Sequence, residues 1–108
     1  MVNKNLVKGI FLAILKNKNE EVHGSLFDKE VTIFYLLNRA KRLISLIEKR
    51  NVANDEIKKY ALKSLTELGD EGFIMVRQNK KKELCFVYHP LKSSLPNLGN
   101  VIIECNEI

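Results

Sequence analysis

The stretch that decides the fold runs from residue 57 to residue 74 and reads IKKYALKSLTELGDEGFI. Its apolar residues recur every three or four positions, at Ile57, Ala61, Leu65 and Leu68, which predicts a helix with one buried face. Asn54, followed by two acidic residues, is a good helix start. Gly69 or Gly72 can take the left-handed conformation that ends a helix. We therefore expect the helix to run from Asn54 to one of these glycines.

Beyond Gly72 the pattern changes from helical to extended. Phe73–Val76 and Leu84–Tyr88 are rich in aromatic and β-branched residues, and the polar tract Arg77–Glu83 separates them. These features predict a β-hairpin with a basic tip, and Pro90 ends its second strand because proline cannot donate to the ladder. After a loop, Val101–Glu104 has the composition of one more short C-terminal strand.

Two further helices are expected before Asn54. Asn3–Lys16 has the apolar periodicity of an amphipathic helix, and Asn17–Gly24 is polar and predicts a loop with a short strand near Val22. A second, long helix can start at Asp28, whose carboxylate can cap its first turn. Its expected buried stripe consists of Val31, Phe34, Leu37, Leu43, Ile44 and Ile47.

The order of three helices and a hairpin resembles the winged-helix (winged helix-turn-helix) family over roughly the first ninety residues. The resemblance predicts an α+β fold, a three-helix core followed by a β-hairpin wing, in one domain spanning residues 1–108. In that family the third helix enters the major groove of DNA and the wing touches the adjacent backbone or minor groove, so the same docking is implied here. The long second helix and the stretch after Pro90 depart from the family pattern, and either feature could serve dimerisation.

The charge balance favours a polyanionic partner. The chain carries a formal net charge of +5 over 108 residues, which points to nucleic acid or an anionic membrane surface unless the lysines only solvate the surface. No apolar run approaches the roughly 20 residues that cross a bilayer. Two cysteines are too few for a disulfide framework, and no signal peptide is recognisable, so we expect a reducing cytoplasm.

Three groups of cations are candidates for DNA contact. On the third helix, three lysines fall off the buried stripe and are expected to face solvent, and Ser64 and Thr66 are weaker candidates. The hairpin tip concentrates cations and amides where they can reach a groove or a backbone. The predicted DNA-binding residues are Asn54, Lys58, Lys59, Lys63, Arg77, Gln78, Asn79, Lys80, Lys81 and Lys82. A third cluster on the second helix, for which a solvated surface is the favoured interpretation, comprises Arg39, Lys41, Arg42, Lys49 and Arg50.

Catalytic and metal sites are not indicated. The acidic pairs Glu20-Glu21 and Asp70-Glu71 sit at loop-like positions without a partner for acid–base work. The residues His23, Cys85, His89 and Cys105 lack the spacing of a zinc site, and we predict no metal and no cofactor. Cys85 is expected to be a small buried strand residue, and the three tyrosines to belong to the core or its edge.

Two functions from different classes follow. The first is a non-enzymatic duplex DNA-binding protein, either a small transcriptional repressor or a site-marking accessory factor of a DNA-processing complex such as a plasmid relaxosome or a replication origin. The alternative is a winged-helix protein–protein interaction module that does not bind DNA and uses the second helix as a dimer seam. A homodimer is expected in both cases, because two third helices can address half-sites about one helical turn apart.

Overall fold

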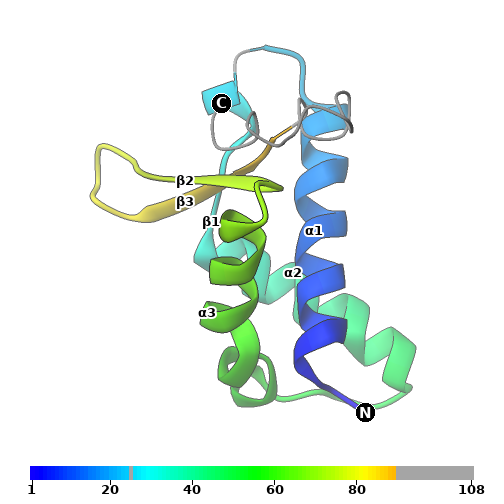
Figure 1. Ribbon diagram of the computed structural model, residues 1–108. Coiled ribbons are helices and arrows are strands. Elements are labelled where there is room, and N and C mark those ends of the chain that lie inside the picture. The colour runs from blue at the N-terminus through cyan, green and yellow to red at the C-terminus, as the bar shows by residue number, and fades with distance from the viewer. Residues whose placement is uncertain (25, 90–108) are drawn as a thin grey trace.

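The computed structural model describes residues 1–24 and 26–89, and this part of the chain has an α+β fold. Its three α-helices are α1 (Lys4–Glu21), α2 (Ile33–Glu48) and α3 (Asn54–Asp70). Its three strands are β1 (Val31–Thr32), β2 (Ile74–Gln78) and β3 (Leu84–Tyr88), and a short 3-10 helix, η1 (Leu26–Lys29), precedes β1. The helices pack into one body, from which the β2–β3 hairpin projects as a wing (Figure 1). The predicted three-helix core with a β-hairpin wing is therefore confirmed.

Helix α1 is longer than the sequence pattern predicts. The side chain of Asn3 caps it by accepting from the backbone N–H of Leu6 at 2.9 Å. The helix continues to Glu21, so the prediction of a loop over Asn17–Gly24 with a strand near Val22 is wrong. The residues after Lys16 include one lysine and two glutamates, which are good helix formers although they are polar. The ammonium of Lys18 also lies 5.3 Å from the centre of the Tyr35 ring, which ties the last turn to α2.

Helix α2 begins at Ile33 and not at Asp28. Val31 and Thr32 pair with β3, and the Thr32 hydroxyl then caps the helix by accepting from the N–H of Tyr35 at 3.3 Å. The helix has 16 residues, so the expectation of an unusually long second helix is wrong. The only strand found before α2 in the described residues is therefore β1, and it arises where the sequence pattern predicts helix.

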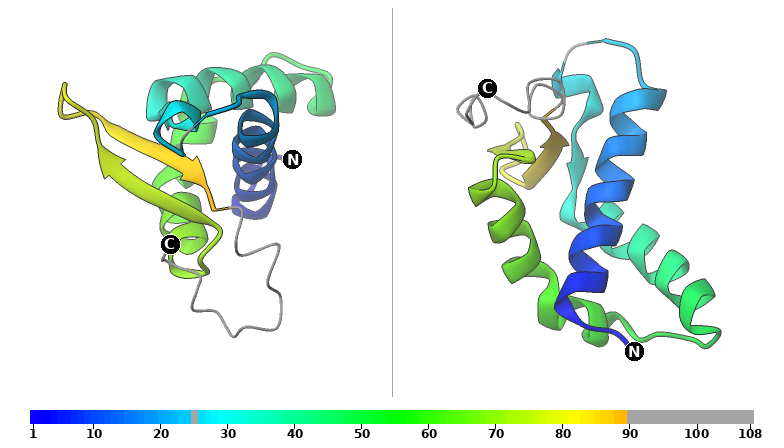
Figure 2. Two further views of the ribbon diagram at one scale, coloured as in Figure 1. Left: turned by 90° about the horizontal axis from the view of Figure 1, so that it is seen from above. Right: turned by 45° about the vertical axis from the view of Figure 1, so that its right-hand side comes forward.

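The buried stripe of α2 also differs from the prediction. It consists of Leu36, Ala40 and Ile44, whereas Phe34 is 66% exposed and Ile47 is 54% exposed. At about 100° per residue, Phe34 lies on the opposite side of the helix from Leu36. Ile47 lies on the side of the stripe but in the last turn, which extends beyond α1 and α3 (Figure 2, right).

Helix α3 matches the prediction most closely. It starts at Asn54, and the four residues of the expected stripe are buried. Gly72, and not Gly69, has the left-handed backbone, with φ 83°. The chain turns there through a hydrogen bond from the N–H of Phe73 to the carbonyl of Leu68, at 2.9 Å. This turn directs the chain from α3 into β2.

The three strands form an antiparallel sheet in the order β1-β3-β2. The predicted hairpin is confirmed, but β2 is shifted toward the tip, so Arg77 and Gln78 belong to the strand and pair with Cys85 and Leu84. The strand expected at Val101–Glu104 lies outside the described residues.

The core lies where α1 crosses the other two helices. Phe11 and Leu15 of α1 are fully buried, together with Leu36 of α2 and Ile57 of α3. At its edge, two lysines of α1 clamp the C-terminal half of α3, with Lys4 2.7 Å and Lys8 3.1 Å from carboxylate oxygens of Glu67. Within the described residues, no helix combines the length and apolar character that crossing a membrane requires.

Candidate nucleic-acid interface

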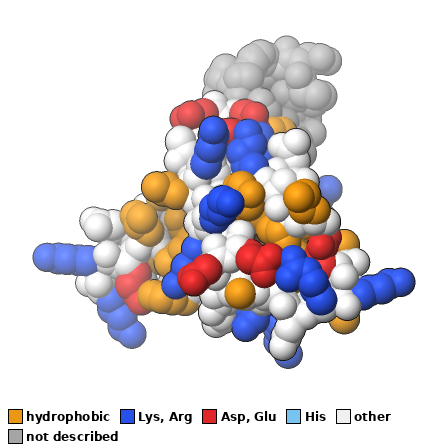
Figure 3. Space-filling view, turned by 90° about the horizontal axis from the view of Figure 1, so that it is seen from below, with side chains coloured by type: hydrophobic (Ala, Val, Ile, Leu, Met, Phe, Trp, Pro, Cys, Tyr) orange, Lys and Arg blue, Asp and Glu red, His pale blue; other side chains and the backbone are white. Residues whose placement is uncertain are grey.

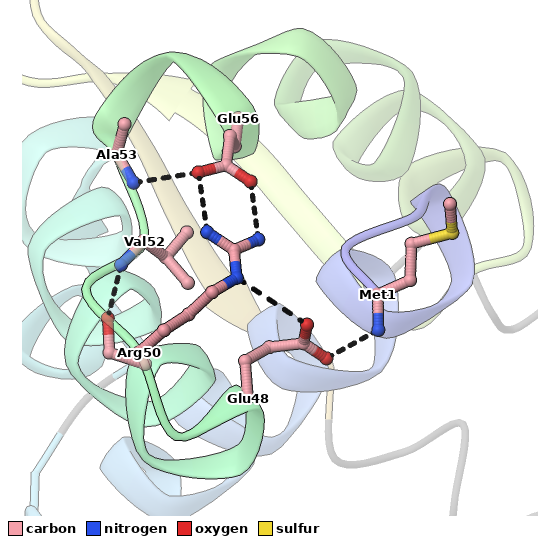
Figure 4. A network of polar contacts seen from close by, with 7 residues as sticks. Met1, Glu48, Arg50, Val52, Ala53 and Glu56 are labelled. Atoms are coloured by element: carbon pink, nitrogen blue, oxygen red, sulfur yellow. Dashed lines mark hydrogen bonds and ion pairs between the residues drawn. The ribbon is translucent and has the colours of Figure 1, made fainter.

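The turn between α2 and α3 is held by a network of polar contacts (Figure 4). The guanidinium of Arg50 donates twice to the carboxylate of Glu56, at 2.7 and 3.1 Å. The same carboxylate accepts from the backbone N–H of Ala53 at 3.0 Å, which caps the start of α3 because Ala53 has no capping side chain. The hydrogen bonds from Arg50 and then from Ala53 lower the pKa of Glu56 to about 2. The direction in which α3 leaves the turn is therefore set by two charged side chains.

Two further contacts complete this turn. The buried N–H of Val52 donates to the hydroxyl of Ser45 at 3.1 Å, and Glu48 accepts from the backbone nitrogen of Met1 at 2.6 Å. Lys49 ends α2 in the left-handed conformation, with φ 57°. Arg50 is one of the cations considered for a surface cluster on α2. Its guanidinium is instead occupied by the ion pair with Glu56 in this turn.

The exposed face of α3 carries the lysines that the sequence predicts to face solvent. Lys58, Lys59 and Lys63, here called the α3 lysines, are all exposed, as are Asn54 and Thr66. Ser64, in contrast, is fully buried, and its hydroxyl lies 3.5 Å from the carbonyl oxygen of Lys4. Ser64 therefore supports the packing of α1 on α3 and cannot reach a ligand.

The tip of the wing is a tight turn organised by Asn79. Its side-chain oxygen accepts from the N–H groups of Lys81 at 2.8 Å and Glu83 at 3.0 Å. Its carbonyl accepts from the N–H of Lys82 at 2.9 Å, and Lys82 has the left-handed conformation, with φ 63°. Asn79 is thus occupied with the turn. The turn in return projects Lys80, Lys81 and Lys82, here called the wing lysines, into solvent.

The other two predicted wing residues lie at its base. Arg77 forms an ion pair with Glu30, which precedes β1, and so joins the wing to the body of the protein. Gln78 is exposed, with its amide nitrogen 3.5 Å from the carbonyl oxygen of Lys82. Within the described part of the chain, the cations in ion pairs are the Met1 amino group, Lys4, Lys8, Arg50 and Arg77. Neither the α3 lysines nor the wing lysines take part in one.

An apolar groove of about 390 Å³ connects α3 to the wing. Its α3 wall includes Lys58, Leu62 and Thr66, and its opposite wall consists of Val76, Leu84 and Phe86 of the hairpin. Ile33 and Leu37 at the start of α2 close one end. Seen from below, hydrophobic side chains are exposed at several places on the face, among lysine, arginine and acidic side chains (Figure 3). The α3 face and the wing are therefore two sides of one surface.

Sequence reasoning did not identify the exposed apolar residues of this groove. Leu62 is 76% exposed, and Leu84 and Val76 are about half exposed. The periodicity contained a signal for Leu62, because this residue falls outside the stripe formed by Ile57, Ala61 and Leu65. For Val76 and Leu84 no local pattern distinguishes a covered strand face from an open one.

The cations of α2 lie on a separate, open surface. Lys41, Arg42 and Lys49 line a shallow groove with Asn38 and Asn51. The guanidinium of Arg39 lies 6.0 Å from the centre of the Tyr35 ring. None of these residues lines the apolar groove between α3 and the wing.

The residues considered for a metal site do not form one in the described part of the chain. Within residues 1–24 and 26–89, no three His, Cys, Asp or Glu side chains are grouped so that they could hold a metal ion. Cys85 is buried in β3 as predicted, and its burial raises the pKa of the thiol. Cys105 lies outside the described residues. Tyr88 is buried, and Tyr35 and Tyr60 pack against the core, as predicted.

Comparisons of the chain with protein families, with curated proteins and with solved structures found no match.

Proposed function

We propose that this protein binds duplex DNA without catalysing a reaction, with α3 directed toward the major groove and the wing alongside the phosphate backbone. The observation that carries the proposal is that exposed lysines without a carboxylate partner stand on two neighbouring elements, α3 and the wing, which the apolar groove joins into one surface. Lys4, Lys8, Arg50 and Arg77 are paired with carboxylates, whereas the α3 lysines and the wing lysines are exposed and form no ion pair in the described part of the chain. Cations without a carboxylate partner on neighbouring elements suit the regularly spaced phosphates of a duplex.

The wing tip provides independent support. A hairpin turn of this kind commonly contains one residue with a positive φ, and glycine or asparagine is preferred there. At φ 63°, Lys82 occupies a position where glycine or asparagine would be relaxed. The turn therefore keeps a third consecutive lysine at a position where glycine would have less backbone strain.

The biological role that fits best is positioning on DNA, as a small transcriptional repressor or as a site-marking factor for a DNA-processing complex in the cytoplasm. A homodimer would present two α3 helices to half-sites about 34 Å apart.

A titration with double alanine variants tests the proposal. We expect a fluorescent 20-base-pair duplex to bind the unmodified protein with an affinity that falls steeply as salt is raised. About five phosphate contacts correspond to a log–log slope of roughly −4 to −5. Lys58→Ala with Lys63→Ala should reduce the steepness by about two units. The matched control, Lys16→Ala with Lys49→Ala, removes two exposed lysines from α1 and α2 and should leave the slope unchanged.

The alternative, a protein–protein interaction module, is favoured by the exposed apolar residues of α2. Phe34, Leu46 and Ile47 are all more than half exposed. If the unmodified protein failed to bind the duplex even at low salt, these residues would become the primary candidates for a partner surface, and sedimentation of Leu46→Asp beside the unmodified protein would show whether that partner is a second copy.

A further inference from the structure

Resting on the proposed function, we propose that Leu62 reads the C5-methyl groups of thymine in the major groove. Leu62 is 76% exposed, more than any other large apolar side chain of α3. An exposed leucine at this place is not explained by the core, because the buried stripe of α3 is centred about 100° away around the helix. Leu62 lies on the flank of α3 that lines the apolar groove beside the wing. Its exposure is explained if the helix meets an apolar group that a duplex supplies.

The position of Leu62 on the helix supports this assignment. At about 100° per residue, Lys58 lies about 40° to one side of Leu62 and Lys59 about 60° to the other, and Lys63 follows beyond Lys59. All three lysines are exposed and can contact the two phosphate backbones that border a groove. In this arrangement Leu62 points to the floor of the major groove of the DNA, between the two phosphate backbones.

The chemistry of a duplex offers one apolar partner there. In the major groove the base edges present hydrogen-bond donors, acceptors and the thymine methyl group, which is the only apolar group among them. Thr66 lies about 40° from Leu62 on the same face and is exposed, so its methyl and hydroxyl groups can contact a neighbouring base edge. The exposed lysines beside Leu62 favour this target over an apolar protein surface, where their desolvation would be costly.

Asp55 lies on the same exposed face, about two helical turns before Leu62. Its carboxylate repels phosphate and stabilises the start of the helix. The backbones are therefore expected along the middle of α3, beside the lysines, and the base edges opposite Leu62.

Replacement of thymine by deoxyuridine tests the inference, because it removes the methyl group and keeps the base pairing. The probe is a 20-base-pair AT-rich duplex, with a second version in which every thymine is deoxyuridine. We expect the unmodified protein to bind the deoxyuridine version at least about four-fold more weakly, the factor that corresponds to one methyl-sized group losing its burial. Leu62→Ala should bind both versions with equal affinity, and Leu62→Met should keep most of the preference for thymine.

Leu46→Ala is the matched control, since it removes an equally exposed leucine (74%) from α2 and should keep the full preference for thymine. Because Leu62 is exposed, its variants should unfold at the same temperature as the unmodified protein, which circular dichroism checks.

The outcomes separate this inference from the proposed function. Equal, salt-sensitive binding of both versions by the unmodified protein would overturn the reading of methyl groups and leave DNA binding in place. A thymine preference that persists in Leu62→Ala would overturn it as well. If neither version binds at low salt, both proposals fail, and a loss of self-association in Leu62→Ala would then identify this face as a protein interface.

Discussion

Arg50 and Glu56 form a two-pronged ion pair across the turn between α2 and α3, with nitrogen–oxygen distances of 2.7 and 3.1 Å. Glu56 also caps α3 through the N–H of Ala53. One carboxylate therefore fixes both the start of α3 and its orientation relative to α2. The exposed face of α3, with its lysines and Leu62, depends on this geometry.

Removing the charge of Glu56 should lower stability in a pH-dependent way. The folded-state pKa of about 2 lies below the ordinary value of 4.5, so the pair contributes its full stability above pH 4.5 and loses it as the pH falls toward 2. Glu56→Gln should accordingly lower the unfolding temperature at pH 7, and the gap to the unmodified protein should close near pH 2. Thermal scans at several pH values measure this gap, and a gap independent of pH would contradict the role of the charge.

Ser45→Ala should destabilise the turn by about 1–3 kcal/mol, because the buried N–H of Val52 loses its hydrogen-bond acceptor. Ser45→Thr keeps the hydroxyl and serves as the control. Urea unfolding gives both free energies. Equal stability of the alanine variant and the unmodified protein would mean that Val52 finds another acceptor.

Lys82→Gly should change folding stability and DNA binding in opposite directions. Relief of the left-handed backbone favours glycine by about 1–2 kcal/mol, and the greater freedom of the unfolded chain offsets about 0.4–1 kcal/mol of this. A gain in the free energy of unfolding of up to about 1.6 kcal/mol is expected, together with weaker DNA binding from the lost cation. If urea unfolding showed a clear loss of stability, the turn geometry at Lys82 would be wrong.

The two sides of α2 should respond differently to truncation. Leu36→Ala should cost about 2–5 kcal/mol because Leu36 is fully buried, whereas Phe34→Ala should change the stability by no more than about 0.5 kcal/mol. If the two variants lost similar free energies of unfolding, Phe34 would be a buried residue, as the sequence pattern predicts, and its exposure in the structure would be contradicted.

The elements that the sequence predicts best are those whose pattern is local. The stripe of α3 and the β-rich runs of the wing have unambiguous periods, and both are found in the structure. The start of α2 could not be predicted, because Val31 and Thr32 form a strand only through pairing with β3, more than fifty residues later. This tertiary pairing outweighs the capping potential of Asp28.

In the candidate site, too, features with a local sequence pattern are predicted, and features that depend on tertiary contacts are not. Exposure of the α3 lysines follows from the helical period, which the sequence contains. The ion pair that holds Arg77 depends on Glu30, 47 residues earlier, and no local pattern specifies it. Asn79 is an exception: its role is local, since its side chain accepts from N–H groups two and four residues on, but in the sequence it is interpreted as a DNA contact. The apolar groove arises only when α3, the start of α2 and the wing come together.

DNA binding through the wing is tested most sharply by comparing the unmodified protein with a variant in which Lys80, Lys81 and Lys82 are alanine, on one AT-rich duplex at two salt concentrations. We expect salt-sensitive binding by the unmodified protein and, in the variant, a log–log salt slope shallower by up to about 2.7, since each phosphate contact accounts for about 0.9. An identical slope in the two proteins would contradict contact through the wing, and an absence of binding at low salt would contradict DNA binding altogether.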